Sequence, residues 1–562
     1  MGSLRDPLRR GNAARHLPIV RVTLDDRVRF LGPISAVQEE RIREAYTYQN
    51  PAWSKALALG FGVRGVPKYL SSWSKQWVRG AGDGEGAAEW SVPRGSLDRL
   101  RVALAEDLEI EDARVGGDPV SMPEHRVTLY DYQERLVSDA QRALEAPVGA
   151  VLWRAPQGSG KTTAALALAT RLGLKTLVVV STTNLQDQWV RRVEAELGMH
   201  AGVIGGGRTA NLDAPIVVGM QQSLRKVVDS IRLSFGLVLA DEVQLFAAKT
   251  FSEVVDRLPA RYRLGVSGDE RRADRKEFLI YERFGDVASE VTHADLVERG
   301  FVHEVEVRIV PTAFDAPWYR ALGEPEPKPG ESEEARRLRG VQAKVEAHDR
   351  LLEEMGADPD RNALVLALVQ ESVRDAGQAI VLSSRREHCR AIDAAAVAAG
   401  LRSGLLLGGA ESREAFAATL RGFQAHEIAV AVGTNQAIGV GFDLPQVARG
   451  VMASPVANAA TGDKQWRQYR GRFARTADGK TDAVVYYLWD SAMFGRAPVR
   501  HLCRWNRRVR ILEDGVWVDG REWSRRENDG DQAKKRCEAI EWRGAGAVAA
   551  TAGRRRRSEA GR

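Results

Sequence analysis

A loop of small residues ending in Lys-Thr constrains the fold of this chain more than any other feature. It lies between an apolar strand expected over 150–153 and a helix expected over 163–172. The loop consists of Ala155, Pro156, Gln157, Gly158, Ser159, Gly160, Lys161 and Thr162. Small residues let successive backbone N–H groups curl around phosphate oxygens, and the helix N-terminus adds a favourable potential. The pattern predicts a triphosphate site in which Lys161 reaches the β- and γ-phosphates and Thr162 ligates Mg2+.

Short β-rich runs alternate with helical segments over much of the chain, which predicts parallel sheets connected by helices. A first set of runs covers 150–153, 176–180, 216–219, 236–240 and 263–267, and a second covers 379–383, 404–407, 428–432, 449–453 and 483–489. Between the sets, 324–334 is rich in Glu and Pro and a charged helical stretch follows, so we expect a mobile connection there. The predicted fold class is α/β, with two tandem doubly wound parallel-sheet lobes, a small N-terminal α/β accessory domain and a basic C-terminal extension.

The chain of 562 residues exceeds the size that one hydrophobic core usually organises, so we expect several domains. The expected segments are a flexible N-terminus (1–15), an accessory domain that is a candidate for nucleic-acid contact (16–115), a linker (116–124), a first, triphosphate-binding lobe (125–310), a linker or insertion (311–360), a second lobe (361–490) and a basic extension with a disordered end (491–562).

Aromatic residues are interleaved with basic ones in the expected accessory domain. They are Trp53, Tyr69, Trp73 and Trp77 among Lys55, Lys68, Lys75 and Arg79. This interleaving is typical of surfaces that stack on bases, but the same aromatics are equally consistent with an ordinary core.

The excess positive charge of the chain lies at its C-terminus. The net charge is +7, and residues 496–562 contain 18 Lys or Arg against 10 Asp or Glu. This excess favours a polyanionic partner, although a basic run such as Arg554–Arg557 is equally typical of a solvated, disordered end. No apolar run approaches the roughly 20 residues needed to cross a bilayer. The three cysteines, Cys389, Cys503 and Cys537, lack the spacing of a disulfide framework or a zinc site, so we expect a cytoplasmic protein without a structural metal.

An acidic pair follows the strand expected over 236–240. Asp241 and Glu242 would lie at its carboxyl end, where ligands bind in open α/β sheets. We expect Asp241 to hold Mg2+ through water and Glu242 to polarise the attacking water. An Asp-Glu pair is common on any surface, but its position after a phosphate loop favours a hydrolytic site.

With Val243 and Gln244, this acidic pair resembles the DEAD/DEAH-box motif of superfamily 2 helicases, most closely the XPB-like and type III restriction (ResIII) branch of phages and bacteria. The resemblance covers about 125–490 and implies that both lobes are RecA-like. It implies that Gln133, in the segment 129–133, contacts the adenine base. The run from Gln468 to Arg475 fits motif VI, Gln-x-x-Gly-Arg-x-x-Arg, so Arg472 and Arg475 would be arginine fingers that reach the γ-phosphate.

The resemblance also implies contacts to nucleic acid and a coupling element. Segments 182–189 and 221–224 resemble motifs Ia and Ib, and 433–445 resembles motif V. Nucleic-acid contacts are implied for Thr182, Thr183, Asn184, Gln221, Ser223 and Thr434, and nucleotide contacts for Asp443 and Gln468. Ser267, Gly268 and Asp269 occupy the place of the family's Ser-Ala-Thr motif, which assigns coupling to Ser267 and Gln244. Asp269 puts an acid where the family has a neutral hydroxyl.

Together these features predict an ATP-dependent helicase or duplex translocase with ATP and Mg2+ as cofactors. The resemblance favours DNA as the substrate and 3′ to 5′ movement. One alternative is the motor subunit of a restriction or phage-defence complex, because the chain shows no nuclease constellation of its own. Another is a nucleotide-gated nucleic-acid-binding switch that does not unwind, which the unusual Asp269 keeps open. Protein partners from a repair, recombination or defence complex are compatible with each hypothesis, and a P-loop ATPase that acts on protein is disfavoured by motif VI.

Overall fold

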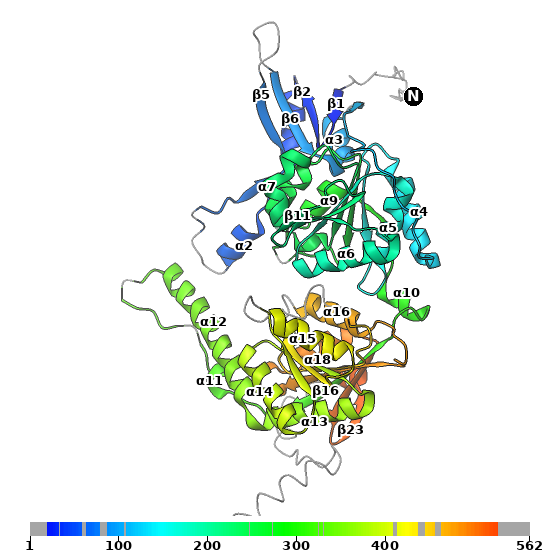
Figure 1. The fold of residues 1–562 in the computed structure, drawn as a ribbon. Coiled ribbons are helices and arrows are strands. Elements are labelled where there is room, and N and C mark those ends of the chain that lie inside the picture. The colour runs from blue at the N-terminus through cyan, green and yellow to red at the C-terminus, as the bar shows by residue number, and fades with distance from the viewer. Residues whose placement is uncertain are drawn as a thin grey trace, which may run out of the picture.

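The computed structural model describes residues 20–525, apart from 33, 59–62, 64, 79–86, 106–107, 247, 273, 324, 330, 409–412, 436–443 and 456–461. A small N-terminal domain lies on a first lobe, and a second lobe lies on the opposite side of that lobe (Figure 1). The expected α/β class with two parallel-sheet lobes is confirmed. Within the described ranges, no helix combines the length and the apolar composition that crossing a membrane requires.

The N-terminal domain is a five-stranded sheet in the order β5-β6-β2-β1-β7, packed against two helices. Its elements are β1 (Val20–Leu24), β2 (Arg27–Leu31), α1 (Ala36–Ala45), β5 (Ser74–Val78), β6 (Ala87–Pro93), α3 (Leu97–Leu104) and β7 (Leu108–Asp112), and β3 (Thr47–Gln49), α2 (Pro51–Ala58) and β4 (Tyr69–Ser71) project beside it. Alternate residues of the strands, such as Val22, Leu24 and Phe30, are buried in its core, because successive side chains of a strand face opposite sides.

The first lobe contains an eight-stranded sheet in the order β11-β10-β12-β9-β13-β14-β8-β15, parallel except for β11. Its strands are β8 (Ala150–Arg154), β9 (Thr176–Val180), β10 (Gly202–Gly205), β11 (Arg208–Ala210), β12 (Ile216–Met220), β13 (Leu237–Asp241), β14 (Tyr262–Ser267) and β15 (Val287–Glu290). Its helices are α4 (Asp131–Leu144), α5 (Lys161–Leu172), α6 (Thr183–Leu197), α7 (Gln221–Ile231), α8 (Ala248–Glu253), α9 (Phe278–Phe284) and α10 (His293–Glu298). The central strands β9 and β13 are buried throughout, which is why they read as continuous apolar runs.

The second lobe contains another eight-stranded sheet, in the order β18-β19-β17-β20-β21-β16-β22-β23. Its strands are β16 (Val305–Thr312), β17 (Ala379–Ser383), β18 (Ser403–Leu406), β19 (Val430–Thr434), β20 (Arg449–Met452), β21 (Ala483–Asp490), β22 (Arg508–Glu513) and β23 (Val516–Asp519). Its helices are α11 (Pro317–Arg320), α12 (Glu333–Ala357), α13 (Pro359–Ala376), α14 (Arg386–Ala398), α15 (Arg413–Gln424), α16 (Gly462–Phe473), α17 (Ser491–Phe494), α18 (Ala497–Trp505) and α19 (Gly520–Arg525). Helix α16 lies on the side of this lobe that faces the first lobe (Figure 1).

The expected domain boundaries differ from the observed sheets in two places. Residues 305–310 fall within the expected first lobe (125–310), but they belong to β16, whose eight residues all pair with β21 in the second sheet. Strands β22 and β23 fall in the expected basic extension (491–562), but they complete the same sheet. An apolar strand fits either sheet by its pattern alone, and pairing with β21 places β16 in the second. The expected mobile connection contains the 25-residue helix α12, which begins at a Ser332 N-cap.

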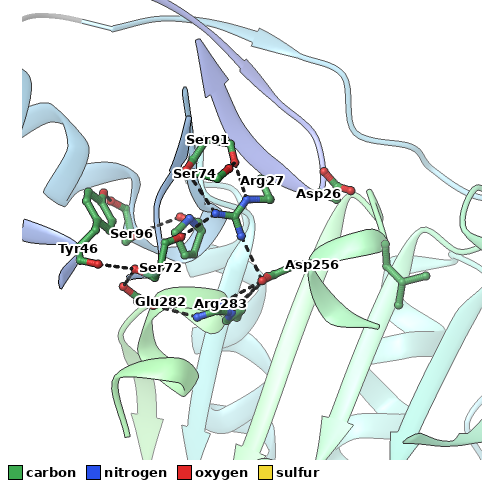
Figure 2. A network of polar contacts seen from close by, with 12 residues as sticks. Asp26, Arg27, Tyr46, Ser72, Ser74, Ser91, Ser96, Asp256, Glu282 and Arg283 are labelled. Atoms are coloured by element: carbon green, nitrogen blue, oxygen red, sulfur yellow. Dashed lines mark hydrogen bonds and ion pairs between the residues drawn. The ribbon is translucent and has the colours of Figure 1, made fainter. Parts of the chain in front are cut away.

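A buried polar network joins the N-terminal domain to the first lobe (Figure 2). Arg27 on β2 donates to the carbonyl of Ser72 at 2.7 Å within its own domain and to Asp256 of the first lobe at 3.2 Å. Asp256 also accepts from Arg283 at 2.8 Å. Arg94 is fully buried and donates to the carbonyls of Ala260 at 2.6 Å and Gly149 at 3.1 Å. Because these groups are largely desolvated and hydrogen-bonded across the joint, we expect the two units to move as one body.

We expect Arg94→Met to loosen this joint, because it leaves the carbonyls of Ala260 and Gly149 buried without their donor. The free energy of local opening should fall by about 2–3 kcal/mol. Hydrogen exchange of the Val115 and Arg261 amides, which bond across the same joint, measures it. Arg101→Met is the control, since its ion pair with Asp98 is exposed and should change stability by less than about 0.5 kcal/mol. Unchanged exchange in Arg94→Met would contradict this role.

Candidate nucleotide site

The phosphate loop lies between the end of β8 and the start of α5, as the sequence predicts. Gly158 and Gly160 have φ values of 87° and 67°, a left-handed backbone that favours glycine. The buried Ala155 donates its amide to the carbonyl of Ser267 at 2.8 Å. Gln133 donates its side-chain amide to the carbonyl of Ser159 at 3.2 Å. These contacts hold the loop against β14 and α4, so Gln133 supports the loop itself.

Three charged side chains meet at the base of the site. The Lys161 ammonium pairs with the Glu242 carboxylate and lies 4.0 Å from an Asp241 oxygen. Burial alone lowers the pKa of Lys161, but the charges of Glu242 and Asp241 outweigh it and hold this pKa above its ordinary value. Burial, together with the charge of Glu242, raises the pKa of Asp241 despite the opposing charge of Lys161. Asp241 also accepts a hydrogen bond of 2.8 Å from the Trp189 indole, which orients it.

The second lobe closes the other side of the same cavity. The cavity has a volume of about 310 Å³, and Lys161, Asp241 and Glu242 line it together with Arg472 and Arg475. A Cβ atom built on Gly158 would lie 3.5 Å from Cγ of Arg475, so the phosphate loop and the segment after α16 are in van der Waals reach. The structure therefore brings the two predicted arginines and the predicted lysine to one site.

Gln244 and Ser267 lie behind Glu242 in the first lobe and are linked to it by hydrogen bonds. The Gln244 amide donates to Glu242 Oε2 at 2.5 Å, and the Ser267 hydroxyl donates to Gln244 Oε1 at 2.7 Å. All three side chains are buried. The expected coupling residues are thus connected to the carboxylate that pairs with Lys161, Gln244 by a direct hydrogen bond and Ser267 through Gln244.

Two predicted nucleotide contacts cannot be placed. Asp443 lies outside the described residues, and the described part of Gln468 is its backbone in α16. Pro156 and Gln157 belong to the phosphate loop, where the Ser159 hydroxyl donates to the Pro156 carbonyl at 2.8 Å and Gln157 lines the cavity.

The residues present fit a magnesium ion that is shared with phosphate oxygens. Thr162 and Asp241 line the same cavity. Both oxygens of Asp241 already accept hydrogen bonds, which suits a contact through water. In the part of the chain that the structure describes, no group of three or more His, Cys, Asp or Glu side chains could hold a metal by itself. Magnesium commonly takes few protein ligands and completes its shell with phosphates and water.

The expected nucleic-acid contacts lie near the carboxyl ends of strands in both lobes. Thr182 caps α6 and accepts from the Leu185 amide at 3.3 Å, and Thr183 and Asn184 beside it are exposed. Thr434 ends β19 opposite Ser383 of β17. Ser223 is half-buried, whereas Gln221 is buried and accepts from Thr250 at 2.7 Å. Gln221 thus faces the interior of the first lobe, whereas Thr183 and Asn184 lie at the surface of that lobe.

The aromatic residues of the N-terminal domain divide into two groups. Trp73 packs against Trp90 with ring centroids 5.6 Å apart, at the edge of the domain core. Tyr69 and Trp77 are 54% and 72% exposed, and Lys68 lies 5.2 Å from the centroid of the Tyr69 ring. Trp73 therefore packs against the domain core, whereas Tyr69 and Trp77 are exposed at the surface, where they could stack on bases.

Some residues that line the cavity were not identified as site residues from the sequence. Arg192 lies four residues after Gln188 on α6, and both face the cavity, so helical spacing was a usable signal. Phe301 and Thr476 also line it. They come from segments far apart in the chain, and the sequence carries no local pattern that singles them out.

A larger cavity, of about 410 Å³, lies at the joint with the N-terminal domain. Its arginines already pair with carboxylates: Arg27 and Arg283 with Asp256, and Arg29 with Asp25 and Asp26. This leaves little positive charge for a phosphate, so the cavity between the lobes is the better candidate site.

Comparison with known proteins gives one family match. Residues 126–269 match the family described as "Type III restriction enzyme, res subunit". The chain is 38% identical over 128 residues to "Probable helicase D10" of Escherichia phage T5, which covers 23% of this chain and 28% of that protein. It is 27% identical over 247 residues to "DNA 3'-5' helicase XPB" of Mycobacterium tuberculosis, which covers 42% and 44%.

Other similarities are more distant or shorter. The chain is 34% identical over 171 residues to a candidate ATP-dependent RNA helicase, L396, of Acanthamoeba polyphaga mimivirus, covering 30% of this chain and 33% of that protein. The alignments span less than half the length of each of these relatives. The crystal structure of T4 UvsW aligns over 84% of this chain and 91% of its own, at 17% identity and a TM-score of 0.37.

We expect Lys161→Ala to weaken binding of a nucleoside triphosphate by about 100-fold, because Lys161 belongs to the phosphate loop and its charge lines the cavity. Glu242→Gln should bind as tightly as the wild type or tighter, because it removes the carboxylate that competes for Lys161. Titration with a fluorescent ATP analogue measures both affinities. Glu253→Gln, at a surface ion pair of the same lobe, is the control. Equal affinity in Lys161→Ala and wild type would refute the site.

Proposed function

We propose that this chain, a ResIII-domain member of helicase superfamily 2, is an ATP-dependent nucleic-acid helicase or duplex translocase. One observation carries the proposal: Lys161, Asp241 and Glu242 of the first lobe share a cavity with Arg472 and Arg475 of the second. A triphosphate in this cavity would contact both lobes. Its binding and hydrolysis would then change how the lobes sit relative to one another, which is the basis of movement along a strand.

Hydrolysis in this site depends on positioning and on charge. Lys161 would exchange the Glu242 carboxylate for phosphate oxygens. Glu242, released from that pair and still held by Gln244, would orient the attacking water and accept its proton. Arg472 and Arg475 would stabilise the charge that develops on the γ-phosphate. Thr162 and Asp241 would hold the magnesium ion, which neutralises phosphate charge when bound.

Nucleic acid is the proposed substrate, and DNA is the form that we favour. Exposed Thr183 and Asn184 in the first lobe and Thr434 in the second can hold phosphates through hydroxyl and amide donors. The basic C-terminal segment suits a polyanion. The relatives' names support both kinds of nucleic acid: one is a DNA 3'-5' helicase and another a candidate RNA helicase.

A second candidate function is the motor subunit of a restriction or phage-defence complex. The matched family is named for the res subunit of type III restriction enzymes. A nucleotide-gated switch without unwinding is the third candidate.

Arg472→Ala and Arg475→Ala should each lower kcat of ATP hydrolysis by at least about 1,000-fold, because each removes a charge from the transition state. Binding of the ATP analogue should change much less than in Lys161→Ala. Steady-state phosphate release gives kcat, and Arg500→Ala, an exposed arginine of the same lobe, is the control. A variant of either finger with normal kcat would remove that arginine from the mechanism.

ATP hydrolysis by the wild type should rise at least about tenfold when nucleic acid is added, and the effect should weaken with salt because phosphate contacts release counterions. Phosphate release is measured with single-stranded DNA, duplex DNA, forked DNA and RNA, alongside strand displacement on the fork. Stimulation with displacement indicates a helicase, and stimulation without displacement indicates a translocase or switch. Hydrolysis that no nucleic acid stimulates would overturn the motor proposal.

A further inference from the structure

An ion pair joins the two lobes away from the arginine fingers. Asp269 lies in the loop after β14 of the first lobe, and its carboxylate accepts from Arg467 on α16 of the second at 3.0 Å. Both side chains are largely shielded, with exposed fractions of 15% for Asp269 and 29% for Arg467. Burial raises the pKa of Asp269, but hydrogen bonds and charge from Arg271 and Arg467 outweigh it and leave this pKa lowered. The carboxylate is therefore ionised at neutral pH.

Aromatic contacts reinforce the same junction. The Arg467 guanidinium lies over the Trp505 ring, 3.8 Å from its centroid. Arg271 of the first lobe approaches the same ring at 5.7 Å and pairs with Asp269 at 2.7 Å. Asp269, Arg271, Arg467 and Trp505 thus form an interlobe cluster with two residues from each lobe. Shielded cation–π contacts and ion pairs are stronger than exposed ones. Arg271 is 50% exposed, so the better shielded Asp269–Arg467 pair is the contact of this cluster that can hold the lobes together.

The interlobe cluster is also connected to the nucleotide site. The Asp269 amide donates to the Ser267 hydroxyl at 3.1 Å, and Ser267 donates to Gln244. Gln244 in turn donates to Glu242, the partner of Lys161. A continuous hydrogen-bonded path therefore runs from the base of the phosphate site to the lobe that carries the arginine fingers. A neutral hydroxyl at position 269 could not form the ion pair that ends this path.

We propose that Asp269 is a positioning residue that holds α16 against the first lobe through Arg467, so that the cleft stays closed without nucleotide. This inference rests on the proposed function. Arg472 lies on α16 and Arg475 just after it, so the position of this helix decides whether the two arginines reach the nucleotide. Nucleotide then binds to a cleft whose second lobe is already in place. The ion pair lowers the cost of closure, and its loss weakens apparent binding of ATP more than turnover at saturation.

Closure of the cleft is measured by single-molecule fluorescence resonance energy transfer in the full-length chain without nucleotide. The labels are placed at Ser230→Cys on α7 and Val397→Cys on α14, both exposed, in a Cys537→Ser background. Asp269→Asn and Arg467→Gln should each raise the ratio of open to closed molecules about tenfold. The double variant should be no more open than either single variant, because both remove the same contact. Asp274→Asn is the matched control, because Asp274 pairs with Arg272 inside the first lobe.

An unchanged ratio in Asp269→Asn, or additive opening in the double variant, would overturn the proposal. In ATP hydrolysis, Asp269→Asn should raise KM about tenfold while kcat at saturating ATP and nucleic acid changes less than about threefold. A fall in kcat with unchanged KM would also overturn it. The fluorescence measurement needs no hydrolysis. A wild type without ATPase activity would therefore contradict the proposed function, while the ratio of open to closed molecules would still test the role of Asp269.

Discussion

The structure of the site depends on how the chain satisfies the charge of Lys161 in a shielded cleft. An isolated ammonium would be costly there, so Glu242 pairs with it and Asp241 lies close by. With Arg192, Arg472 and Arg475 lining the same cavity, four cations face two carboxylates. The remaining positive charge suits a polyanionic ligand, and such a ligand would take over Lys161 and release Glu242. The same interaction therefore stabilises the ligand-free cleft and makes it responsive to a triphosphate.

The two interfaces of the first lobe differ in a way that defines the moving parts. Its joint with the N-terminal domain is crossed by buried hydrogen bonds and ion pairs of Arg94, Arg27 and Asp256, and the arginines that line the cavity there already pair with carboxylates. Its interface with the second lobe contains a cavity, the phosphate loop and the Asp269–Arg467 pair. The N-terminal domain and the first lobe are thus expected to move as one unit, which carries the exposed Tyr69 and Trp77 with it.

The local patterns of the sequence predicted a large part of this architecture. The strands at 150–153, 176–180 and 263–267 recur as β8, β9 and β14 within a few residues. The phosphate loop and the Asp241–Glu242 pair could be found because each lies directly after a strand, at the edge where parallel sheets bind ligands. The boundary between the lobes could not be found this way, because β16 has the same apolar character as the strands of either sheet.

The sequence by itself determined the order of the phosphate loop, the acidic pair and the arginine-bearing helix, because each is a contiguous segment whose chemistry is readable from neighbours a few residues away. Only the tertiary structure decided that Arg475 faces Gly158, that Trp189 orients Asp241, and that Asp269 pairs with Arg467, 198 residues away. Contacts of this kind depend on how two sheets close on one another. That closure results from the packing of whole lobes, which no local pattern of residues encodes.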